Sequence, residues 1–98
     1  MMSLQIFVPN DEDPTSWFLF INDSLKKVNL EFELLIVDLN TIDFLDTDDL
    51  VVLACLLDSF LNVKKKIKFV NGTDKLLAHL RNIKFQKYWD SSFDRDKF

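Results

Sequence analysis

The chain has 98 residues, 48% of them hydrophobic and 29% charged, and it contains only one glycine and two prolines. This composition is typical of one compact globular domain over residues 1–98, and it excludes a disordered segment and a two-domain protein. Sixteen acidic residues against twelve basic ones give a net charge of −4, which disfavours binding to nucleic acid or to an anionic membrane surface.

Signals for export and for membrane insertion are missing from the sequence. No apolar run approaches the ~18 residues of a membrane-spanning helix, and no basic segment leads into an apolar one at the start of the chain. We therefore expect a cytoplasmic protein that does not insert into a membrane. The single cysteine, Cys55, excludes an intrachain disulfide and a zinc site built on thiolates, and its apolar neighbours predict a small buried side chain.

The first third of the chain predicts a strand followed by a helix. Residues 4–8 are apolar enough for a short strand, which Pro9 would end because proline cannot donate to a ladder. Asp13 suits a helix N-cap, and Pro14 suits the first helical position. The apolar face of this helix, ending near Lys26-Lys27, would comprise Trp17, Ile21, Leu25 and Val28.

The middle of the chain predicts a central strand and a second helix. Residues 32–39 are apolar on both faces apart from Glu33 and Asp38, as expected for a strand with helices packed on each side. The helix that follows would end at Lys64-Lys65-Lys66. Its core-facing residues would be Leu50, Leu53, Ala54, Leu57 and Leu61.

A third strand at residues 67–70 and a third helix complete the predicted repeat. The pair Asn71-Gly72 indicates a turn, and Thr73 with Asp74 can cap a helix carrying Leu76, Leu77, Leu80 and Ile83. Residues 84–89 fit either an edge strand or more helix, and residues 91–98 fit a last helix or a frayed end. The β-α-β-α-β-α order predicts a small α/β fold with a mostly parallel or mixed four-stranded sheet and three to four helices.

Catalytic arrangements are absent from the sequence. His79 is the only histidine and stands off the leucine stripe of the third helix, where a solvated or half-buried side chain is expected. With one histidine a transition-metal site is not expected, and with one glycine there is neither a phosphate-binding loop nor a nucleophile elbow. The chain is therefore expected to be no enzyme, with no cofactor and no bound metal.

The stretch "LNTIDFLDTDDLVVL" contains four carboxylates, and three interpretations fit this pattern. A metal site would lack the glycine and the distal glutamate of a calcium loop. A phosphoacceptor at Asp38 would require a longer chain with more strands. In the third interpretation Asp46 or Thr47 caps the second helix and the next two acids stabilise its first turn. The four acids concerned are Asp43, Asp46, Asp48 and Asp49.

Two longer stretches, "LLIVDLNTIDFLDTDDLVVLACLLDSF" and "KIKFVNGTDKLLAHLRNIKF", resemble the STAS domain, the family of sulphate-transporter and anti-sigma-factor-antagonist domains. The resemblance covers roughly residues 32–90 and is most specific at residues 37–39 and 43–47. It implies a STAS-like sandwich that acts through protein–protein contact. In the bacterial antagonists, the Ser or Thr after the loop aspartate is phosphorylated by the anti-sigma factor, which is a kinase. That position here is Thr47, preceded by Asp46.

The sequence departs from the family pattern directly after Thr47. Family members often have Ser-Gly there, whereas this chain has Asp48-Asp49. Two fixed negative charges could mimic a phosphorylated state or repel an acidic kinase surface. The resemblance therefore also allows a constitutive docking subunit of a transport ATPase or signalling complex, without phosphorylation.

The second predicted helix is apolar on more than one side. If its leucine face packs in the core, Val51, Val52 and Cys55 lie toward the other side. A helix that is apolar all round is either buried or partnered. The predicted partner surface comprises Asp46, Thr47, Asp48, Asp49, Val51, Val52 and Cys55, and a homodimer stays open.

Overall fold

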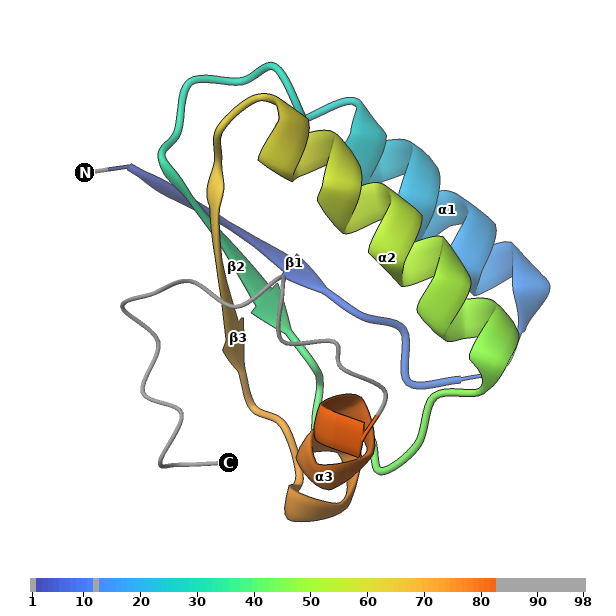
Figure 1. Cartoon of the computed structure of the whole chain (residues 1–98). Coiled ribbons are helices and arrows are strands. Elements are labelled where there is room, and N and C mark those ends of the chain that lie inside the picture. Colours follow the sequence, from blue (N-terminus) through green and yellow to red (C-terminus); the bar gives the residue numbers. More distant parts are fainter. Residues whose placement is uncertain (1, 12, 83–98) are drawn as a thin grey trace.

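The computed structural model describes residues 2–11 and 13–82, which form one parallel sheet with helices between and after its strands (Figure 1). The elements are β1 (Ser3–Phe7), α1 (Pro14–Leu25), β2 (Leu34–Asp38), α2 (Thr47–Asn62), β3 (Lys66–Val70) and α3 (Asp74–Asn82). The predicted β-α-β-α-β-α order is confirmed, and the three described strands are all parallel in the order β1-β2-β3. No helix of this part of the chain is long and apolar enough to cross a membrane.

The predictions for the end of the chain fall on residues that the structure does not describe. These are the fourth strand or continued helix at 84–89, the tail at 91–98 and the core contact of Ile83. The described residues therefore establish a small α/β fold with three strands and three helices.

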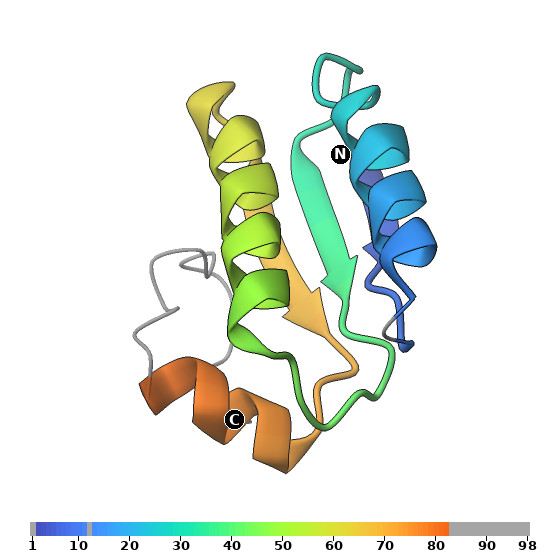
Figure 2. The ribbon, with the colours of Figure 1, turned by 90° about the vertical axis from the view of Figure 1, so that its right-hand side faces the viewer.

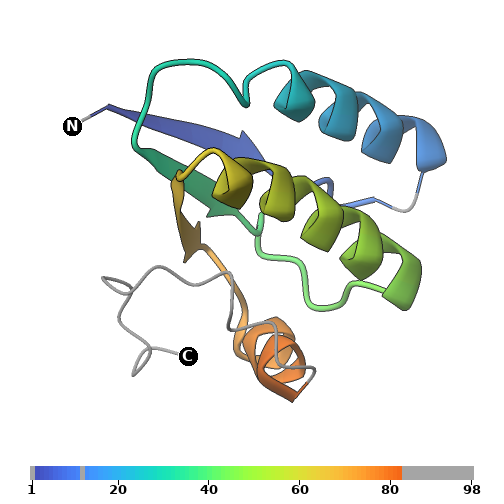
Figure 3. The ribbon, with the colours of Figure 1, turned by 45° about the horizontal axis from the view of Figure 1, so that its top comes forward.

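Helices α1 and α2 cover the same face of the sheet, as two views at different angles show (Figures 2 and 3). The strand order follows the chain order, so two right-handed crossovers place both helices on one side. Within residues 2–11 and 13–82 no helix lies over the opposite face of the central strand, so helices on each side of it are not confirmed there. Leu34 and Ile36, which point to the opposite face, are only partly buried. A half-exposed apolar face and a covered one look alike in sequence.

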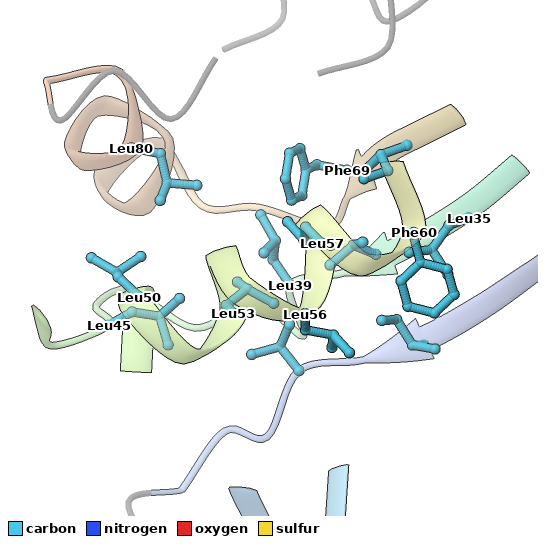
Figure 4. Packing of buried hydrophobic residues seen from close by; sticks show 14 of the residues in the cluster. Leu35, Leu39, Leu45, Leu50, Leu53, Leu56, Leu57, Phe60, Phe69 and Leu80 are labelled. Atoms are coloured by element: carbon cyan, nitrogen blue, oxygen red, sulfur yellow. The ribbon is translucent and has the colours of Figure 1, made fainter. Parts of the chain in front are cut away.

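The core lies between the sheet and the helices (Figure 4). Leu35 and Val37 of β2 are fully buried beneath the helices. Leu50 and Leu80 bring α2 and α3 together beyond the carboxyl ends of the strands, where Leu45 also packs. Most predicted core positions of α2 are confirmed, and the buried set of that helix is Leu50, Leu53, Leu56, Leu57 and Phe60.

Helix α1 begins as predicted, and its predicted apolar face is confirmed except at Leu25. Asp13 caps it by accepting a hydrogen bond from Thr15 N at 2.9 Å, and Pro14 is its first residue. Trp17 is buried and Ile21 packs against the core, as does Val28 just beyond the end of the helix, whereas Leu25 is exposed. Ser24 is buried instead, because the packed stripe turns toward it at the end of the helix.

Candidate functional site

A pocket of about 360 Å³ opens at the carboxyl end of the sheet. It lies among the segment after β1, the loop between β2 and α2, and the first turn of α2. Binding surfaces in open α/β sheets form at this end, because loops from neighbouring strands meet there. The pocket is lined by Pro9, Asn10, Asp11, Trp17, Asn40, Thr41, Ile42, Asp43, Phe44, Leu45, Asp46 and Asp49.

The acid-rich stretch forms the start of α2, as one of the three interpretations predicted. Asp46 is the N-cap, and its carboxylate accepts a hydrogen bond from Asp49 N at 3.2 Å. Asp48 and Asp49 lie in the first turn, where free N–H groups and the positive end of the helix dipole favour carboxylates. Asp46 therefore caps the helix, and Thr47 is its first residue.

The four predicted acids do not converge on one point. Asp43, Asp46 and Asp49 line the pocket, whereas Asp48 is exposed outside it. Among residues 2–11 and 13–82, no group of three or more His, Cys, Asp or Glu side chains is placed to hold a metal ion. The geometry of the described residues therefore gives the metal interpretation no support.

Sequence reasoning missed the hydrogen-bonded position of Asp38. This carboxylate is only 4% exposed, and it accepts bonds from Gln5 Nε2 at 2.9 Å, Asn71 Nδ2 at 2.9 Å and Asn40 N at 2.8 Å. The three donors come from β1, from the residue after β3 and from the loop after β2. The available signal was a polar residue within the first strand and polar residues directly after the other two, at Gln5, Asn40 and Asn71. Because Asp38 is buried and occupied, it is not placed as an accessible phosphoacceptor.

The loop after Asp38 has an unusual backbone. Asn40 and Thr41 have φ values of 56° and 53°, in the left-handed region that β-branched residues such as threonine rarely adopt. Thr41 N donates to Asn71 O at 3.0 Å, and Asn40 Nδ2 donates to Val8 O at 3.2 Å. These bonds to the other two strand ends hold the loop, and with it the pocket wall, in place.

The outward side of α2 carries most of the predicted partner residues. Thr47, Val51 and Cys55 are spaced by four residues, and Asp48 and Val52 form the neighbouring row, so all five lie on one side of the helix. All five are exposed. We call this set the outer face of α2. The prediction that Cys55 is a buried hydrophobe is wrong, because the apolar run around it serves two sides of the helix and Cys55 is on the solvent side.

Phe44, in the loop between β2 and α2, contacts α3 through its ring. Its ring is 65% exposed and lies 5.6 Å from the His79 ring, centroid to centroid, at an interplanar angle of 36°. His79 is half-buried, as predicted. The neighbouring Leu45 is buried and anchors the loop from below. An aromatic side chain is thereby displayed next to the acids.

No protein-family model matches the chain, and neither the curated proteins nor the solved structures provide a match. The resemblance to STAS domains thus stays a prediction from the sequence.

Proposed function

We propose that this chain is a cytoplasmic, non-catalytic regulator of the STAS type that resembles an anti-sigma factor antagonist. Its docking surface would be the outer face of α2 together with Asp46 and Asp49, and its switch would be phosphorylation of Thr47 by a partner kinase. The observation that carries the proposal is the position of Thr47: it is exposed, opens α2 directly after the Asp46 cap, and begins a row continued by Val51 and Cys55.

A phosphate at Thr47 would change this surface strongly. The γ-phosphoryl group of ATP would pass to the Thr47 oxygen, with loss of the hydroxyl proton and release of ADP, and add about −1.5 to −2 charges. The site already holds Asp46 and Asp48 on either side of Thr47. A partner bound to the unmodified face would then meet repulsion and the desolvation of a dianion, which favours release.

The chemistry of the face defines the partner it suits. Val51, at 57% exposure, and Val52 offer apolar contact, while the charged side chains at the helix start are all acidic. A complementary surface would place an apolar patch against the valines and Lys or Arg side chains against the acids. Charge complementarity of this kind sets partner choice and association rate.

A second function is favoured by Asp48 and Asp49. With two fixed negative charges in the first turn, the face could be permanently in the state that a phosphate would otherwise create. The chain would then be a constitutive docking subunit of a transport ATPase or signalling complex, and Thr47 would not be modified.

Two measurements test these proposals. Mass spectrometry of the protein purified from its native cells, or incubated with native lysate and ATP, should show a phosphate on Thr47, and Thr47→Ala should remove it. Capture from native lysate should yield the same partner with the wild type and with Thr47→Ala, but not with Thr47→Glu. A partner retained by all three proteins, with no phosphate on Thr47, would support the constitutive subunit and contradict the switch.

A matched pair of valines tests the docking surface itself. Val52 on the outer face and Val63 beyond the end of α2 are both 40% exposed. Val52→Asp should abolish capture of the partner, whereas Val63→Asp should leave it unchanged. Equal capture by both variants, each shown to be folded by circular dichroism, would place the docking surface elsewhere.

A further inference from the structure

The outer edge of β1 presents backbone groups without a neighbouring strand in the described part of the chain. Glu33 N donates to Met2 O at 3.0 Å, and Val8 N donates to Asp38 O at 2.9 Å, so the backbone groups of Met2 and Val8 point toward β2. Alternation along the strand therefore turns the N–H and C=O groups of Ser3, Gln5 and Phe7 away from β2. Within residues 2–11 and 13–82, β1 pairs with β2 alone.

The two edge strands of the described sheet differ in how they are protected. Natural sheets guard their edges with lysine, proline or bulges, because an open edge pairs with other strands. β3 carries Lys66 and Lys68 on the face away from the helices. In the same register rows, β1 has the uncharged Ser3 and Gln5, and the whole strand SLQIF has neither charge nor proline. β1 therefore lacks the charged or proline residues that keep other strands from pairing with an open edge.

We propose that the β1 edge is a self-association site, at which β1 of a second copy of this chain pairs antiparallel about a two-fold axis through Gln5. Ser3 would then face Phe7 of the partner copy, and Gln5 would face its own equivalent. The two residues of each such pair exchange both backbone hydrogen bonds. The two sheets would become continuous, and both open edges would be removed.

The side chains of β1 suit this register. Of Ser3, Gln5 and Phe7, whose backbone groups point away from β2, Phe7 has the largest side chain and is 57% exposed. It would lie opposite Ser3, which has the smallest. On the other face, the partly buried Leu4 would lie against Ile6 of the second copy. Because β1 has no charged residue, no like charges would meet across the pair of strands.

The flank of α1 provides charge complementarity for a second copy. A groove of about 420 Å³ runs between β1 and α1, and its lining includes Leu19, Asp23 and Lys27. Asp23 lies in the last turn of α1, and Lys27 lies two residues beyond the end of that helix. In the two-fold arrangement the α1 helices would run antiparallel, so the flank of one copy that carries Asp23 and Lys27 would lie beside the same flank of the other, and acidic and basic side chains would meet there. This inference is independent of the proposed function, because the groove shares no residue with the outer face of α2.

The first test measures mass against concentration by sedimentation velocity or by light scattering on a sizing column. Ser3→Pro removes an outward N–H at the first position of the strand, where proline leaves the β1–β2 ladder intact. It should weaken dimerisation roughly tenfold or more, since each Ser3 would donate one interchain bond. Ser3→Ala keeps the N–H and should dimerise like the wild type. Circular dichroism and the melting temperature verify folding of both variants.

The second test is amide hydrogen exchange read residue by residue by NMR. The amides of Gln5 and Phe7 should exchange slowly at high protein concentration and faster on dilution, because their hydrogen-bond partners would belong to the second copy. A protein that is monomeric at all concentrations would overturn the proposal. A dimer insensitive to Ser3→Pro with fast exchange at Gln5 and Phe7 would overturn it in favour of another face. Slow exchange of these amides in a monomer would also overturn it and indicate that the chain covers its own edge.

Discussion

Asn71 Nδ2 donates a 2.9 Å hydrogen bond to Oδ2 of Asp38, and this bond joins the end of β3 to the end of β2. Gln5 Nε2 donates to the same oxygen from β1, so one carboxylate links all three strands. The pocket and the start of α2 lie directly beyond this link. The position of the candidate site therefore depends on the buried carboxylate of Asp38.

Asp38→Asn should destabilise the protein by about 2 kcal/mol, because every orientation of the amide sets its NH₂ group against a donor. In one orientation that donor is Asn40 N, and in the other it is the Gln5 and Asn71 side chains. The free energy of unfolding in urea measures the effect. Asp43→Asn, which changes an exposed carboxylate, should shift the same free energy by less than about 0.5 kcal/mol. Equal effects of both substitutions would contradict the role of Asp38.

Lys65, in the loop between α2 and β3, forms hydrogen bonds with the loop between α1 and β2 at the amino end of the sheet. Its Nζ donates to Leu30 O at 2.8 Å and Phe32 O at 2.7 Å, and it lies 4.2 Å from the centroid of the Phe32 ring. Lys65→Met keeps an apolar stem but loses these contacts, and we expect a loss of about 1–2 kcal/mol in unfolding free energy. Lys75→Met in α3 serves as the control, with a change below about 0.5 kcal/mol. Thermal and urea unfolding should agree on the order of the three proteins.

Asp46→Ala should remove the cap of α2 and cost about 1 kcal/mol of stability. Asp46→Asn keeps an oxygen that can accept the hydrogen bond from Asp49 N, so most of the stability should remain. Hydrogen exchange of the amides in the first turn of α2 would locate the effect, with Asp49 N exchanging faster in the alanine variant. Unchanged exchange there would mean that Asp46 does not hold the helix start on which Thr47 is displayed.

Much of this fold could be predicted because local patterns and tertiary packing agree. The leucine spacing of residues 50–61 indicates a helix, and the pair Asp13-Pro14 indicates where a helix begins, and the structure has both features. The predicted placement of Thr47 at the start of α2 follows from the same local rules.

The parts that could not be predicted depend on contacts between distant residues. Hydrophobicity does not say which side of a strand a helix will cover, so Leu34 and Ile36 were expected to be enclosed. Cys55 was misplaced for a related reason: a helix that is apolar on two sides has two candidate cores, and only the position of the sheet decides between them. The Asp38 network joins residues more than thirty positions apart, which no local pattern reveals.

Gly72 permits α3 to pack closely against the end of the sheet. A Cβ at this position would lie 2.8 Å from Leu77 Cδ2 and 3.0 Å from Leu39 Cδ1, and both leucines are buried. Gly72→Ala should therefore cost about 1–3 kcal/mol through overpacking. A double-mutant cycle with Leu77→Ala identifies the cause: the alanine at 72 should be tolerated better once the leucine is shortened, so the two costs should add to more than the cost of the double variant. Strictly additive costs would show that the loss arises in the turn backbone and not in the contact with Leu77.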